Sequence, residues 1–252
     1  MKANLIRRIA IAICLLSCIS IYSCKKENSG SGTTTESNVG TASDDQSQVS
    51  TESDIVTTDA NTALSGQSSF SGSFSSSAEG NGTVELNSVD AGAQIGSLVN
   101  IHNLICDATI TYDTVNTNRV ITIVYDGTNC WGNRTRSGTV TISLPLGQHW
   151  KDAGATATIN VESLKITRLR DGKSITLNGT KTITNVSGGL LKDLSSLQTI
   201  THTITGDLVA TFDNGSQRTW NVSKMRVFTY NNGIVITTTG THSDGTNSNI
   251  AE

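Results

Sequence analysis

Long runs in which apolar side chains alternate with threonine are the feature that most constrains the fold of this chain. In LQTITHTITGDLVATF, Ile200, Ile204, Leu208 and Phe212 occupy even positions, and threonines fill most of the odd ones. A period of two is typical of a strand with one buried face and one solvated face. The same alternation occurs in residues 139–144 and 175–184. The sequence therefore predicts a mainly β fold.

Turn sequences divide these runs into hairpins. RDGK at 170–173, DNG at 213–215 and NNG at 231–233 are typical hairpin turns. They separate strands of about 12 to 15 residues, which favours a long antiparallel meander, or a sandwich made by folding that meander over, instead of a compact immunoglobulin-like domain. A change of apolar parity within residues 161–164 predicts a β-bulge there.

One short helix is expected before the strands. In AGAQIGSLVNIHNLI, residues 91–105, apolar side chains recur at three- and four-residue spacing, which is typical of an amphipathic helix. Residues 85–252 are therefore predicted to form a single mainly β domain with one short N-terminal helix.

The first 23 residues predict an export signal. Lys2, Arg7 and Arg8 precede an apolar run at 9–21 that is too short to span a bilayer. The end of this run, IYSCKKEN, resembles the lipobox of bacterial lipoproteins, in which the cysteine after a small residue is lipidated. That resemblance implies lipidation at Cys24 and a membrane anchor made of several acyl chains, such as palmitate.

Two alternatives to lipidation at Cys24 remain open at this point. LLSC at 15–18 also fits the lipobox pattern, but cleavage there leaves the apolar residues ISIYS on the mature chain. An ordinary secretory signal is the other alternative, because Tyr22 is atypical of a lipobox.

Charge divides the remaining chain into two parts. Residues 24–84 carry eight acidic residues and two lysines, and they are rich in Ser, Thr and Gly. Such a segment has too little apolar surface to offset its ordering entropy, so it is predicted to be a disordered tether. Residues 85–252 carry thirteen basic and thirteen acidic residues, a balance that argues against a nucleic-acid partner.

Cysteine usage predicts one disulfide bond. Once the signal is removed and Cys24 is acylated, Cys106 and Cys130 remain, and an even pair in an exported protein favours a disulfide. The strand-like runs CDATITYD and RVITIVYDG are joined by TVNTN, so the chain folds back and brings the two cysteines almost opposite each other.

The stretch YDGTNCWGNRTRSGTV contains the candidate binding residues. Trp131, Arg134 and Arg136 are expected at a hairpin tip with both arginines projecting into solvent, and Trp150 follows LPLGQH. Tryptophans can serve as platforms for sugars, and arginines are planar hydrogen-bond donors. The alternative interpretation is a solvated turn without a ligand.

Sequence motifs for catalysis or cofactor binding are missing. The four histidines are scattered, and no Gly-x-Ser-x-Gly elbow, phosphate loop or calcium loop occurs. His202 and Trp220 fall on apolar strand faces and are expected in the core. No catalytic residue, metal or cofactor is therefore expected, although carboxylate pairs for glycoside hydrolysis depend on the fold and keep a hydrolase as the third alternative.

The run CDATITYD…RVITIVYDGTNCWGNRTRSGTVTI, with NGTKTITN and FDNGSQRTWNV further on, resembles a family of Bacteroidota lipoproteins. The similarity covers residues 104–251. It implies a lipid-anchored protein of the outer membrane, on its periplasmic or cell-surface face, and brings no activity with it.

These observations predict a membrane-anchored cell-envelope lipoprotein whose β-domain binds or scaffolds without catalysis. A glycan-binding accessory protein at the cell surface is the second alternative. The expected partners are the membrane, through the lipid anchor, and a glycan or an envelope protein.

Overall fold

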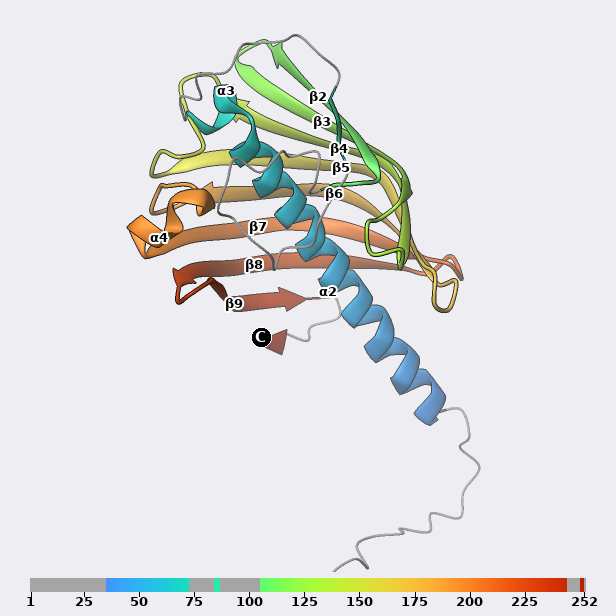
Figure 1. Ribbon diagram of the computed structural model, residues 1–252. Helices are drawn as coiled ribbons and strands as arrows, with labels where there is room; N and C mark the ends of the chain where they lie inside the picture. The colour runs from blue at the N-terminus through green and yellow to red at the C-terminus, as the bar shows by residue number, and fades with distance from the viewer. Residues whose placement is uncertain (1–34, 73–83, 87–104, 244–249, 252) are drawn as a thin grey trace, which may run out of the picture. The chain divides into compact units, whose positions relative to one another are not determined.

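The alternating runs form a single antiparallel sheet. The computed structural model describes residues 35–72, 84–86, 105–243 and 250–251. In this part of the chain, ten strands pair in chain order, so each strand contacts the next one along the sequence (Figure 1). The strands are β1 (Val84–Leu86), β2 (Ala108–Val115), β3 (Asn118–Thr128), β4 (Arg134–Pro145), β5 (Ala155–Arg168), β6 (Ser174–Asn185), β7 (Thr199–Phe212), β8 (Gln217–Tyr230), β9 (Ile234–Ser243) and β10 (Ile250–Ala251).

The predicted mainly β fold with long antiparallel strands is confirmed. Strands β4 to β8 span 12 to 14 residues each. All three predicted hairpin turns occur, between β5 and β6, between β7 and β8, and between β8 and β9. Of the two predicted arrangements, the meander is the one observed among the described residues.

A helix, and not a second sheet, covers one face of the meander. From Ala42 onward, helix α2 (Thr35–Gly66) crosses the sheet obliquely, as Figure 1 shows. Contacts divide the chain into two compact units, Met1–Thr41 and Ala42–Glu252, and the helix residues that pack on the sheet belong to the second. The other helical segments are α3 (Ser68–Ser71), η2 (Leu191–Asp193) and α4 (Leu194–Leu197).

The prediction of a disordered tether over residues 24–84 is wrong for residues 42–72. These residues form most of α2 and all of α3, and they bury Val56, Leu64 and Phe70 almost completely. The segment has too little apolar surface to fold alone, but the sheet supplies the apolar and cationic surface that its own sequence lacks. Composition predicted disorder for this segment because the sheet that stabilises it is encoded elsewhere in the chain.

Three predicted features fall outside the described residues. They are the export signal at 1–23, lipidation at Cys24, and all but the last residue of the helix expected at 91–105.

Local irregularities let neighbouring strands approach closely. The predicted bulge at 161–164 is confirmed, because the pairing of β5 with β6 shifts there and Ser163 has a φ of 50°. Gly138 has a φ of 125°, and a Cβ at this position would collide with the backbone of Ser163. Gly206, with a φ of 150°, would collide in the same way with the carbonyl oxygen of Thr180. Only glycine satisfies both the backbone angle and the close contact at these positions.

The core lies between α2 and the sheet. Trp150 and Trp220 are each 1% exposed, which confirms the prediction for Trp220. His202 is also buried, as predicted, and its ring lies edge-on to Trp150 and Phe228 at centroid distances of 5.2 and 5.1 Å. Burial lowers the pKa of His202 to about 4, so the ring is neutral at physiological pH.

Candidate functional site

The covered face of the sheet carries cations at positions where strand alternation places core residues. Arg136 on β4, Lys181 on β6, and Lys224 and Arg226 on β8 are all buried. Desolvating a charge costs several kcal/mol unless it is paired, so each of these side chains requires a partner. Helix α2 provides partners for all four.

Two carboxylates and a tyrosine hydroxyl surround the first of these cations, Arg136. Its Nε and Nη2 donate to the two carboxylate oxygens of Asp107 at 2.6 and 2.5 Å, and its Nη1 donates to Asp59 Oδ2 at 2.7 Å. The Tyr125 hydroxyl also donates to Asp59 Oδ2, at 2.8 Å, and the guanidinium lies 4.2 Å from the centroid of the Tyr125 ring. Burial alone would lower the pKa of Arg136, but Asp59 and Asp107 outweigh it and raise this pKa above its ordinary value.

The direct hydrogen-bond partners of Lys181 are all neutral oxygens. Its Nζ donates to the carbonyl oxygen of Ser53 at 2.8 Å, to Ser53 Oγ at 2.9 Å and to Thr57 Oγ1 at 2.6 Å. Burial lowers the pKa of Lys181 to about 7. The charge of Asp54 offsets part of this shift, whereas Arg226 and Lys224 add to it. A serine hydroxyl beside a lysine of depressed pKa is a nucleophile arrangement used by hydrolases. Here, however, helix and sheet cover both groups, and Ser53 is only 1% exposed.

Acidic residues of α2 pair with cations along the rest of the interface. Asp54 lies between Lys224 and Arg226, at 3.3 and 3.5 Å. Asp44 accepts two hydrogen bonds from Arg168, at 2.9 and 2.7 Å, and one from Lys173 at 2.8 Å. The hydrogen bonds from Arg168, and to a smaller extent the one from Lys173, hold the pKa of Asp44 well below its usual range.

Glu52 is the most deeply buried acid near this end of the interface. Its Oε1 accepts a hydrogen bond from Arg134 Nε at 2.6 Å, and the side chain of Glu52 is only 1% exposed. Burial raises the pKa of Glu52, because its desolvation outweighs the attraction of Arg134.

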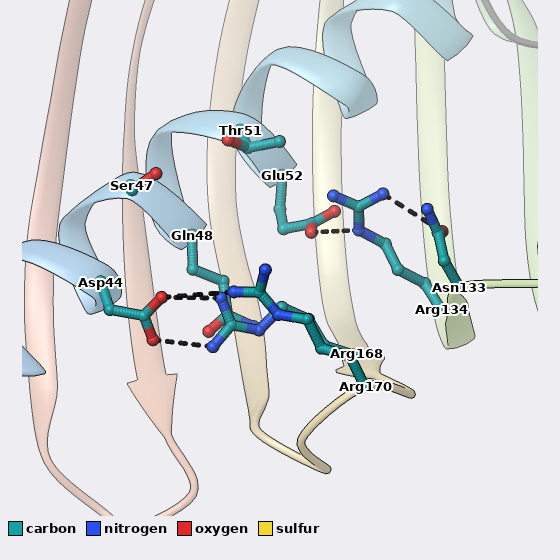
Figure 2. Close-up of a pocket in the computed structure, with 9 residues that line it drawn as sticks. All are labelled: Asp44, Ser47, Gln48, Thr51, Glu52, Asn133, Arg134, Arg168 and Arg170. Carbon is teal, nitrogen blue, oxygen red and sulfur yellow. Dashed lines mark hydrogen bonds and ion pairs between the residues drawn. The ribbon is translucent and has the colours of Figure 1, made fainter.

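A polar recess of about 260 Å³ opens beside these pairs. Figure 2 shows its walls: α2 contributes Gln48 and Glu52, the start of β4 contributes Arg134, and the end of β5 with its following turn contributes Arg168 and Arg170. In Figure 2, Glu52 points toward Arg134, and Gln48 points toward Arg168 and Arg170. The recess therefore collects hydrogen-bonding groups from three elements far apart in sequence.

The structure separates the residues that were expected to form a binding tip. Trp131 is exposed, at 58%. The prediction that Arg134 and Arg136 project into solvent is wrong, because both side chains turn toward α2 and pair with its carboxylates. Trp150 does not present an exposed ring: it is 1% exposed, and its Nε1 donates to Asn61 Oδ1 at 2.8 Å.

The predicted disulfide between Cys106 and Cys130 is confirmed. It joins the residues just before β2 to those just after β3, with a Cα–Cα distance of 5.5 Å. Next to it, Asn129 Oδ1 accepts hydrogen bonds from the backbone N–H groups of Asn133 and Arg134 at 3.1 Å. The turn that precedes β4 is thus fixed by a covalent bond and by local hydrogen bonds.

Sequence reasoning missed α2 and the recess beside it. Lys181, Lys224 and Arg226 share strand parity with core residues, and that signal alone requires acidic partners from elsewhere. Asp45, Glu52 and Asp59 recur at seven-residue intervals, which is two helical turns. Read together, the two patterns point to an acidic helix lying on a cationic sheet face.

Two features are absent from the described residues: a cluster of metal-ligating side chains and a membrane-spanning helix. No group of three or more His, Cys, Asp or Glu side chains is arranged to hold a metal ion there. In that same part of the chain, no helix combines the length and apolar character needed to cross a membrane.

Comparison with known proteins gave no match to a protein-family model, to a curated protein or to a solved structure.

Proposed function

We propose that this protein is a lipid-anchored protein of the cell envelope whose β-domain binds a ligand or partner without catalysis. The observation that most supports a binding role without catalysis is that the charged and nucleophilic side chains on the covered face are already bonded within the protein. Arg136 is paired with Asp59 of α2, and Lys181 is hydrogen-bonded to Ser53 and Thr57, whereas the polar recess is open to a ligand. Such an arrangement favours recognition over chemistry.

The anchor is proposed from the sequence of the N-terminal region. A basic start, a short apolar run and the IYSC sequence support lipidation of Cys24, and the resemblance to Bacteroidota lipoproteins supports an outer-membrane location. The lipid would hold the domain at the membrane, on the periplasmic or cell-surface face.

Detergent phase partitioning of the full chain tests this proposal. Wild-type protein expressed in a bacterial envelope is expected in the detergent phase, and Cys24→Ala is expected in the aqueous phase or unprocessed. Cys18→Ala is the matched control, because it removes the competing lipobox cysteine, and it should partition as wild type does. Wild-type protein found wholly in the aqueous phase would contradict the anchor.

A glycan-binding accessory role is the second candidate, supported by the composition of the recess. Its arginines, amides and hydroxyls are the groups that bind sugars, and Trp131 is an exposed aromatic on the loop leading into β4. Because Trp150 and Trp220 are buried, a change of tryptophan fluorescence on adding a glycan would report mainly on Trp131. Trp131→Phe should abolish that change; a change that persists in the variant would arise from the core.

A hydrolase remains the third candidate, and the covered position of Ser53 and Lys181 argues against it. Their side chains have the chemistry of a nucleophile and its base, but a substrate could reach them only after α2 leaves the sheet.

A further inference from the structure

The recess contains buried polar atoms without partners among the described residues. They are Gln48 Nε2, Glu52 Oε2 and Arg168 Nε. Gln48 is 4% exposed and Glu52 is 1% exposed, so solvent compensates for little of their polarity. Leaving such an atom unpaired is costly, and native proteins seldom carry several together. A ligand in the recess could relieve that cost after small side-chain rotations.

The charges around the recess fit a ligand with one negative charge. Among the residues that line it, Arg134, Arg168 and Arg170 outnumber Asp44 and Glu52 by one positive charge. Beside the recess, the charges of Asp171 and Lys173 offset each other. Arg170 is the most accessible of the three arginines, because its side chain is 70% exposed and its contacts with Asp44 and Asp171 are ion pairs at 3.6 and 3.4 Å. Because these two contacts are long and the side chain is exposed, its guanidinium can exchange them for a bidentate pair with a ligand carboxylate.

The remaining wall groups favour a ligand that also carries hydroxyl groups. Glu52 Oε2 can accept a hydrogen bond, and the exposed side chains of Ser47 and Thr51 can both donate and accept. The two wall carboxylates would repel a compact dianion such as phosphate, but they accept hydrogen bonds from sugar hydroxyls. A volume of about 260 Å³ lies below the range of about 300 to 1,000 Å³ typical of drug-sized ligands, and so suits a single sugar ring.

We propose that this recess binds the carboxylate-bearing ring of an acidic sugar. Arg170 and Arg168 would receive the carboxylate, while Gln48, Thr51 and Glu52 would bond the hydroxyl groups. This proposal rests on the proposed binding function and names the ligand class for it. The site differs from the Trp131 loop, since Trp131 does not line the recess.

Titration calorimetry on the full chain tests the ligand class. The probes are D-galacturonate, D-galactose as its uncharged counterpart, and sulfate as a compact dianion. Galacturonate is expected to bind at least tenfold more tightly than either of the others, because only it combines one negative charge with several hydroxyl groups.

Two variants place the binding in the recess. Arg170→Ala should weaken galacturonate binding at least tenfold, and Thr51→Val, which keeps side-chain shape but removes the hydroxyl, should weaken it several-fold. Arg218→Ala is the matched control: it removes the same charge from a residue that does not line the recess, and affinity should stay within twofold of wild type.

Three results would overturn the proposal. They are no detectable galacturonate binding, galactose or sulfate binding as tightly as galacturonate, and an unchanged galacturonate affinity in Arg170→Ala. None of these results bears on membrane anchoring, which detergent partitioning measures separately. Failure of the acidic-sugar proposal is thereby distinguishable from failure of the proposed envelope function.

Discussion

Lys181 Nζ donates to Thr57 Oγ1 across 2.6 Å, and this contact joins the centre of the sheet to the middle of α2. Lys181 is fully buried, yet its direct hydrogen-bond partners are neutral oxygens of Ser53 and Thr57. The attachment of the helix at this point therefore depends on the protonation state of one amine.

Lys181 should make stability rise with pH above neutrality. Its pKa is about 7 in the folded protein and 10.5 for a free lysine, so between these values the unfolded chain binds more protons. The free energy of unfolding then increases with pH across that window, by about 2 kcal/mol from pH 7 to pH 9 for this group. Urea denaturation of wild type and Lys181→Met at the two pH values should show this increase in wild type only. Parallel pH profiles would refute it.

Removing Arg136 should destabilise the protein strongly. Arg136→Met leaves Asp107 and Asp59 buried without their cation, and breaking a buried pair in this way costs about 3 to 5 kcal/mol. Chemical denaturation at neutral pH measures the loss. Arg136→Lys should give an intermediate value, because it keeps the charge but not the bidentate geometry. Lys165→Ala, at an exposed position, should change stability by under about 0.5 kcal/mol, as expected for surface substitutions. A cost for Arg136→Met as small as that control would show that the buried cluster does not hold the interface.

Strand periodicity made the sheet predictable from sequence. The alternation from Ile200 to Phe212 and the turn residues at 170–173 gave the strands, their lengths and the hairpins, because each depends on residues close together in the chain. The disulfide followed from the same hairpin geometry. Whether the meander stays open depends on what covers its apolar face, which local patterns do not encode.

The helix and the recess could not be derived from local patterns in the same way. Residues 42–66 consist largely of Ser, Thr and Asp, which are poor helix formers, so propensity and composition both argued for disorder. Arg134 and Arg136 were placed in solvent for a related reason: their partners Glu52 and Asp59 lie 82 and 77 residues away in sequence. The buried lysine on β6 was the available sign that a polar element covers the sheet.

Substituting Gly206 should disturb the sheet where two strands lie closest. An alanine Cβ would collide with Thr180 and Lys181, and its φ of 150° is unfavourable for any side chain. Gly206→Ala should therefore cost about 1 to 3 kcal/mol in the free energy of unfolding. Gly147→Ala is the control, because nothing lies within 4 Å of its added Cβ, and it should leave the melting temperature almost unchanged. Equal effects of the two substitutions would contradict the steric argument.

Loss of the Cys106–Cys130 disulfide should destabilise the protein by about 3 kcal/mol, given a sequence separation of 24 residues. The Cys106→Ser, Cys130→Ser double variant, compared with wild type under non-reducing conditions, measures this cost. Thiol titration of denatured, unreduced wild type should detect neither cysteine. Two reactive thiols assigned to these positions by mass spectrometry would remove the basis of the prediction.

Helix α2 should form only on the sheet. An isolated peptide of residues 42–66 is expected to be less than about one fifth helical by circular dichroism, because it lacks strong helix formers and short isolated helices are marginal in water. In the full chain, Val56, Ala60 and Leu64 are buried, so the backbone amides around them should exchange with solvent as slowly as those of β6.

Lys224→Ala with Arg226→Ala removes both partners of Asp54 and should speed amide exchange in α2 more than in the sheet. The matched control replaces Lys165 and Arg218, two cations that lie outside these pairs, and should leave the exchange rates of α2 unchanged. A strongly helical peptide, or α2 amides unaffected by the loss of Lys224 and Arg226, would mean that the helix is stable by itself. In that case the cations of the sheet would only position α2, and its folding would not depend on them.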